Sequence, residues 1–95
     1  MSRDAQTWFR KLRMGLNPVE KLIGGELAYR AEDDTHHAWP TQRRIADDTE
    51  VPVRTVARTL ATLEAKGVIS RFGVDEDTNA VIWRLNVDIV NRRAS

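Results

Sequence analysis

The chain has 95 residues, 41% hydrophobic and 31% charged, as is typical of one globular domain with a single core. It contains no cysteine, which excludes disulfide frameworks and thiolate metal sites and favours an intracellular setting. No apolar run approaches the roughly 18 residues that a membrane span needs, and no apolar segment follows the N-terminal charges, so we expect neither a membrane partner nor a signal peptide.

The distribution of charge along the chain is more informative about possible partners than the formal net charge of +1. Residues 1–21 carry five basic and two acidic side chains, and residues 39–72 carry six and four. Acidic side chains are in excess in residues 26–34 and 73–79. Because positive and negative segments alternate, one face of a nearly neutral protein can be basic, as binding to a nucleic acid requires.

The first expected element is a short basic amphipathic helix over residues 4–14, within an N-terminal segment 1–16, with Gly15 placed as its C′ residue. Its aromatic side needs to be covered in so short a chain. We expect it to fold back on the domain or to form a homodimer, and we favour both over an arm that follows DNA. The residues of such a dimer contact would be Trp8, Phe9 and Leu12.

The second expected helix has a clear start. In the motif "NPVE", Asn17 is the N-cap, Pro18 is at N1 and Glu20 is at N3, which is a variant of the capping box. The helix is predicted to run to about Arg30. The pair at 24–25 is Gly-Gly, and each glycine costs about 1 kcal/mol relative to alanine, which favours close approach of another helix. The apolar stripe of this helix comprises Val19, Leu22, Ile23 and Leu27.

Two further helices joined by a tight turn are expected over residues 41–48 and 53–66. Thr41 is a good N-cap for the first helix. Pro52 is expected to open the second, where its missing N–H costs little, and Gly67 is placed to end it. The sequence therefore predicts a helix–turn–helix after a polar loop.

The outer face of helix 53–66 carries arginine. At 100° per residue, Arg54 and Arg58 lie opposite the apolar side, and Thr55 and Thr59 flank them, where hydroxyls can bind phosphates. Arginine suits guanine because its fork donates two hydrogen bonds to O6 and N7. Exposed arginines are usually only solvated, so the helix–turn–helix frame is what favours DNA contact. The apolar stripe comprises Val56, Leu60 and Leu63.

A β-hairpin with a polar tip is expected to follow. Residues 68–74 and 80–86 are rich in β-branched and aromatic residues, and "DEDTN" lies between them. Residues 87–95 form a tail that either adds a short helix or frays. The predicted fold class is therefore mainly α with a small β-hairpin.

The stretch "WPTQRRIADDTEVPVRTVARTLATLEAKGVISR" resembles the winged helix-turn-helix DNA-binding domains. In it, "RRIADDTEVP" is similar to their support helix and turn, and "VRTVARTLATLEAKGVI" to their recognition helix and first wing strand. The resemblance covers residues 17–85. It implies a three-helix core plus wing over residues 17–86, with an extra N-terminal helix. The segment from "NPVEKLI" to "AWP" is most similar to small phage and plasmid replication initiators and regulators.

The resemblance implies sequence-specific binding of double-stranded DNA through recognition helix 53–66. The protein would be a small transcriptional regulator or a phage- or plasmid-type replication or recombination accessory factor, cytoplasmic and nucleoid-associated. The positions similar to base-contacting ones are Val53, Arg54, Ala57 and Arg58. Those similar to phosphate-contacting ones are Thr41, Gln42, Arg43 and Thr55, aided by the dipole of helix 41–48.

The sequence departs from the family at two places. Glu50 stands in the turn where the family often has glycine, which predicts an ordinary φ and another turn type. The wing, residues 73–79, is acidic rather than basic. If the wing contacts DNA, we expect Arg71 or Arg84 at its base to make the contact.

A different class of function remains open, namely a winged-helix protein-protein interaction module in a larger assembly. The near-neutral charge and the acidic wing motivate it. We expect Trp39 and Trp83 to be core or hairpin anchors rather than platforms for stacked bases.

We expect no enzyme, metal or cofactor. No Gly-rich phosphate loop or Ser/His/Asp set is present, and the carboxylates lie in loops and turns. His36 and His37 follow three acidic residues, but neighbouring side chains point in different directions, and no other His or Cys completes a metal site.

Overall fold

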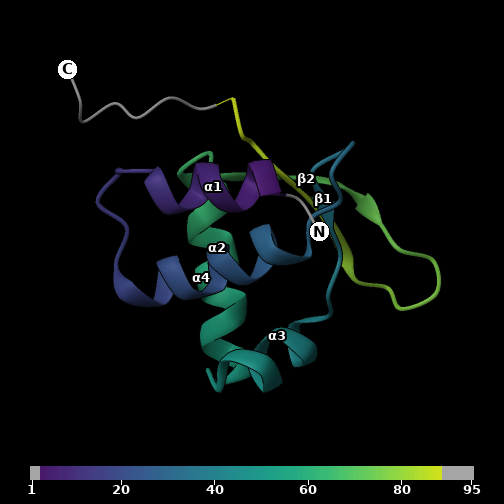
Figure 1. Cartoon of the computed structure of the whole chain (residues 1–95). Coiled ribbons are helices and arrows are strands. Elements are labelled where there is room, and N and C mark those ends of the chain that lie inside the picture. The colour runs from purple at the N-terminus through teal and green to yellow at the C-terminus, as the bar shows by residue number, and fades with distance from the viewer. Residues whose placement is uncertain (1–2, 89–95) are drawn as a thin grey trace.

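The structure is a computed structural model that describes residues 3–88 (Figure 1). Within this range the elements are α1 (Arg3–Lys11), α2 (Pro18–Arg30), β1 (His37–Ala38), α3 (Gln42–Thr49), α4 (Val53–Ala65), β2 (Ile69–Val74) and β3 (Val81–Leu85). Helices predominate and a small antiparallel sheet accompanies them, so the predicted winged helix-turn-helix fold is confirmed. The prediction for the tail concerns mainly residues 89–95, which lie outside the described range.

The central helix α2 forms as its sequence predicts. Asn17 Oδ1 accepts a hydrogen bond from the Glu20 N–H at 2.8 Å, and Glu20 Oε1 accepts one from the Asn17 N–H at 3.0 Å. Both halves of the capping box are therefore present. Ile23 and Leu27 are fully buried, whereas Leu22 from the predicted apolar stripe is 47% exposed. The buried stripe of α2 is thus narrower than its sequence implies.

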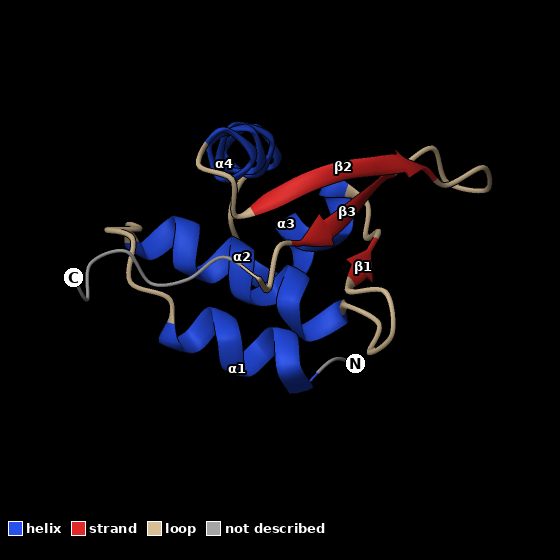
Figure 2. Ribbon diagram, turned by 90° about the horizontal axis from the view of Figure 1, so that it is seen from above, coloured by secondary structure: helices blue, strands red, loops and turns tan. Residues whose placement is uncertain are grey.

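Helix α1 folds back on α2 (Figure 2), as one of the sequence alternatives predicted. Phe9 is only 3% exposed, and its ring lies against Gly24. A Cβ at Gly24 would be 2.3 Å from Phe9 Cζ, so the glycine permits the close approach of the two helices. Because Phe9 and Leu12 are buried within their own chain, these two side chains are not available to a second copy.

Helix α1 ends at Lys11, earlier than predicted. Arg13 Nη1 donates to the carbonyls of Arg10 at 2.8 Å and Leu12 at 3.0 Å, so a side chain satisfies the end of the helix. Gly15 has a left-handed φ of 74°, but it lies in the loop beyond this end. Its predicted role as the C′ residue of α1 is therefore wrong.

The sheet has the order β1-β3-β2, and its neighbouring strands are antiparallel. The hairpin of β2 and β3 was predicted, whereas β1 was not, because two residues give no sequence pattern. Trp83 in β3 is buried, as predicted. Trp39 is 39% exposed, so its predicted place in the core is wrong: it directly follows the buried Ala38 of β1, and side chains alternate between the two sides of an extended segment.

Candidate nucleic-acid interface

The N-terminus of α3 is capped and open to solvent. Thr41 is its N-cap, as predicted, and Thr41 Oγ1 accepts a hydrogen bond from the Arg44 N–H at 3.0 Å. Ile45 and Ala46 are buried. Gln42 and Arg43, in the first turn of α3, are exposed. The first turn of α3 therefore offers backbone N–H groups and a cation to an anionic ligand.

The turn between α3 and α4 differs from its prediction. Glu50 has φ 60° and ψ 26°, which is the left-handed conformation that glycine adopts most easily. The expectation of an ordinary φ at Glu50 is therefore wrong, because the turn keeps the geometry that favours glycine. Pro52 is the N-cap residue of α4 rather than its first helical residue, and α4 begins at Val53.

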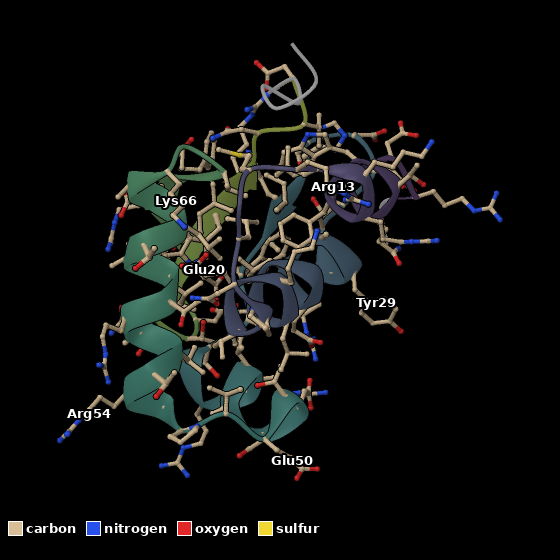
Figure 3. All side chains as sticks on the ribbon, turned by 90° about the vertical axis from the view of Figure 1, so that its left-hand side faces the viewer. Arg13, Glu20, Tyr29, Glu50, Arg54 and Lys66 are labelled. Carbon is tan, nitrogen blue, oxygen red and sulfur yellow. The ribbon has the colours of Figure 1, made fainter. Side chains whose placement is uncertain are left out.

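Helix α4 buries one side and exposes the other. Arg54 and Arg58 are exposed, and neither guanidinium group forms an ion pair or hydrogen bond with any of residues 3–88. Figure 3 shows Arg54 pointing away from the body near the start of α4. Val53 is also exposed, and the neighbouring Thr55 and Ala57 are half-buried. The predicted base-contacting residues thus lie together on or beside one open face.

The buried side of α4 contains the polar residue Thr59, for which the sequence predicts a position beside the exposed arginines. The apolar side chains Val56 and Leu63 are fully buried, as predicted. Thr59 is only 7% exposed, so its predicted phosphate contact is wrong. The reason is helical geometry, since Thr59 lies one turn from Val56 and one turn from Leu63 on the same side.

Arg43 and Arg44, adjacent in sequence, have different environments. Arg44 Nε donates to Asp48 Oδ2 at 3.1 Å, and Asp48 also accepts a hydrogen bond from Arg30. These interactions, led by the hydrogen bond from Arg44, lower the pKa of Asp48. Arg43 has no such carboxylate among the described residues. Arg44 is therefore held within α3 by Asp48, which Arg30 links to α2, and Arg43 remains free for a ligand.

The two arginines expected at the base of the wing interact within the chain. Arg71 lies 3.3 Å from Glu64 Oε2, and its guanidinium is 5.1 Å from the centre of the Trp83 ring. Arg84 Nη1 donates to Asn86 Oδ1 at 2.7 Å. Both arginines are thus less free to bind phosphate than Arg54 and Arg58. The acidic tip of the wing projects away from the helices (Figure 1).

A hollow of about 240 Å³ separates the start of α3 from the end of the wing. Thr41 and Gln42 line one side, and Thr78 and Asn79 line the other. Asn79 is exposed in a left-handed conformation with φ 64°. The sequence identified Asn79 only as part of a hairpin tip, because its proximity to α3 depends on how the sheet packs. Asn79 joins the candidate interface as a polar, uncharged side chain.

The family profile of the helix-turn-helix domain matches residues 14–69, more than half of the chain. The chain belongs to this family. The matched range contains α2, α3, α4 and the turn at Glu50. Family membership points to DNA as the partner, and it fits the exposed arginine face of α4.

The search of curated proteins found no match, and the search of solved structures found none. Within residues 3–88, no helix is both long and apolar enough to cross a membrane.

Proposed function

We propose that this protein binds double-stranded DNA sequence-specifically through α4. The observation that carries the proposal is the open face of α4, where Arg54 and Arg58 lie one turn apart without a carboxylate partner among residues 3–88. A helix of this width fits the major groove, and its first turns are the part that reaches base edges. An arginine guanidinium group without a carboxylate partner at that end can donate two hydrogen bonds, to guanine O6 and N7.

Phosphate anchoring would come from α3 and its neighbours. Thr41, Gln42 and Arg43 lie at the capped N-terminus of α3, where N–H groups and the helix dipole favour an anion. Thr55 is half-exposed in the first turn of α4. Such contacts hold the protein in register on the duplex, while base contacts from α4 supply the sequence preference.

The biological role that we propose is that of a small transcriptional regulator or a phage- or plasmid-type replication or recombination accessory factor. The support is the similarity of the segment from "NPVEKLI" to "AWP", residues 17–40, to the small initiators and regulators of that subgroup. Both roles require recognition of a defined site in duplex DNA, so one experiment tests their common basis.

The test starts from a duplex selected by the protein from a random pool, compared with a scrambled duplex. R54A/R58A should lose about 1–3 kcal/mol per arginine on the selected duplex and much less on the scrambled one. The matched control R54K/R58K keeps both charges but loses the planar guanidinium groups that donate two hydrogen bonds to one base. It should therefore keep the affinity for the scrambled duplex and lose the preference for the selected duplex. Fluorescence anisotropy measures the affinities of the parent and both variants for the two duplexes. Unchanged affinity of R54A/R58A for the selected duplex would reject the proposal.

A single phosphate contact should behave differently. R43A should weaken binding to both duplexes equally and lower the slope of log K against log salt by about 0.9. An effect confined to the selected duplex would instead place Arg43 at a base.

A second candidate function is that of a protein-interaction module. The wing favours this candidate. Its tip is acidic, and the side chains of Phe72 and Val74 in strand β2 are 64% and 57% exposed. Titration against random duplex DNA at two salt concentrations separates the candidates. A DNA-binding protein tightens as salt falls because it releases counterions, whereas absence of binding at low salt would favour the interaction module.

A further inference from the structure

Helix α1 and the loop after it present a second basic surface. Only two carboxylates, Asp4 and Glu20, occur in the same part of the chain. Glu20 is buried and lies 2.9 Å from Lys66 Nζ, so it neutralises a cation of α4 rather than one of this surface. The surface, termed here the α1 basic face, comprises Arg3, Arg10, Lys11, Arg13 and Lys21.

The cations of the α1 basic face lack carboxylate partners. None of the five forms an ion pair with another residue in the range 3–88. The basic residues that do form ion pairs in this range are Arg30, Arg44, Lys66, Arg71 and Arg84. Arg13 and Lys21 of the α1 basic face donate to carbonyls at the end of α1. Arg3, Arg10 and Lys11 form no ion pair in this range and remain available to a ligand, as Arg54 and Arg58 do.

The α1 basic face contains a hollow of about 310 Å³ lined in part by Arg10, Arg13 and Lys21. Lys21 Nζ lies 3.3 Å from the Leu12 carbonyl oxygen, to which it donates at the end of α1. Burial, and then the positive charge of Arg13, lower the pKa of Lys21. Cations that repel one another around a hollow are stabilised by an anion placed between them.

The α1 basic face lies away from the surface of α4 that carries Arg54. Helix α1 packs on α2, and α2 packs on α3 and α4, so α2 separates the two surfaces (Figure 2). Figure 3 shows Arg13 and Arg54 toward opposite ends of the molecule. A helix with its side chains is about 10 Å across. A straight duplex docked on α4 and the N-terminus of α3 would therefore not reach α1.

We propose that the α1 basic face binds the phosphate backbone of a second DNA duplex, so that one molecule bridges two duplexes. The bridging rests on the proposed function of α4, which holds the first duplex. Several unpaired cations along one helix suit a regular polyanion, whose binding releases counterions. An anionic membrane fits less well, because Phe9 and Leu12 are buried and α1 has no apolar side left to insert.

The experiment measures capture of a labelled duplex by a second duplex fixed to beads, with the full chain as the bridge. The variant R3Q/R10Q/K11Q removes three charges but leaves Arg13 and Lys21, which bind carbonyls at the end of α1. We expect this variant to lose at least about tenfold in capture while its one-duplex affinity on α4 changes by less than about threefold. The matched control R3K/R10K/K11R keeps all three charges and should capture as the parent does.

Each other outcome overturns the bridging proposal. Parent-like capture by R3Q/R10Q/K11Q would show that bridging uses two α4 surfaces of a dimer. Preferential binding of phosphatidylserine vesicles or poly-glutamate over duplex, lost in this variant, would assign the α1 basic face to a different anion.

The same variants also test separately whether α4 is the surface that binds the first duplex. If R54A/R58A kept the one-duplex affinity and R3Q/R10Q/K11Q lost it, α1 would be the sole DNA site, and both proposals would fail. If R54A/R58A lost this affinity and the glutamine variant kept both affinity and capture, only the bridging proposal would fail.

Discussion

At the scale of single residues, each arginine's environment depends on which carboxylate lies within reach. Arg44 binds Asp48 across one helical turn, and Arg71 reaches Glu64 from the neighbouring strand. Arg54 and Arg58 have no acidic residue on their face of α4. Ion pairs at a surface contribute little to stability, about 0–1 kcal/mol. Their larger effect here is to remove some arginines from the set available to DNA.

The left-handed backbone conformation at Glu50 predicts how a substitution there changes stability. A left-handed conformation costs a residue with a Cβ about 1–2 kcal/mol, and glycine avoids this cost but loses chain entropy. We expect E50G to raise the free energy of unfolding by roughly 0.5–1 kcal/mol. Urea unfolding monitored by circular dichroism measures this change.

The control for this prediction is E50A, which removes the same carboxylate but keeps a Cβ. It should give no comparable gain, because the strained φ remains. Equal stabilisation by E50A and E50G would show that the charge of Glu50, not its conformation, is unfavourable.

At the scale of elements, the packing of α1 on α2 depends on one of two adjacent glycines. A Cβ at Gly24 would lie 2.3 Å from Phe9 Cζ, whereas a Cβ at Gly25 would have its nearest contact at 4.0 Å. Only Gly24 is therefore required for close packing. Gly25 weakens the helix without this benefit.

The two glycines make a matched pair of variants. G24A gains helix propensity but forces the buried Phe9 ring to move, so we expect a net loss of about 1–2 kcal/mol. G25A should instead stabilise by about 0.5–1 kcal/mol. Urea unfolding of both variants measures the difference, and similar effects of the two substitutions would contradict the assigned role of Gly24.

At the scale of the whole molecule, Glu20 joins the start of α2 to the end of α4. Its carboxylate accepts hydrogen bonds from the Asn17 N–H and from Lys66 Nζ (Figure 3). Burial raises the pKa of Glu20, but the hydrogen bonds from Lys66 and Asn17 outweigh burial, so the pKa lies below its ordinary value. The ionised form of Glu20 therefore stabilises the fold.

This depressed pKa predicts a pH dependence. The stabilisation is present above the ordinary pKa of glutamate, about 4.3, and is lost as pH falls through the lower pKa of the folded state. E20Q should lose about 1–2 kcal/mol of unfolding free energy at pH 7. The difference from the parent should shrink below about pH 4. Urea unfolding at several pH values measures it.

The control for E20Q is E76Q, at an exposed glutamate of the wing. It removes the same charge and should change stability little at any pH. If the deficit of E20Q were the same at pH 3 and pH 7, ionisation of Glu20 would not be its cause.

Local patterns in the sequence predicted most helix boundaries of the fold. Asn17 and Thr41 cap helices as expected, and Gly67 ends α4 with a left-handed φ of 80°. These signals work because each depends on hydrogen bonds between residues three to five positions apart. The outward position of Arg54 and Arg58 follows from helical periodicity in the same way.

Contacts between segments far apart in the chain determined the features that these local patterns did not predict. The two-residue strand β1 exists because it pairs with β3, and Trp39, which directly follows β1, is 39% exposed. Arg71 and Arg84 lie near partners that the register of β3 determines. A sequence pattern cannot specify such contacts, because they join segments far apart in the chain.

The sequence by itself determined the helix–turn–helix, the hairpin after it and the arginine face of α4. Local hydrogen bonding and the period of the apolar residues suffice for these features. Only the tertiary structure decided that Glu20 pairs with Lys66 and that α1 turns its aromatic side inward onto Gly24. These two contacts leave the cations of α1 unneutralised and exposed. The second basic surface therefore results from folding, because it depends on which charges are buried together.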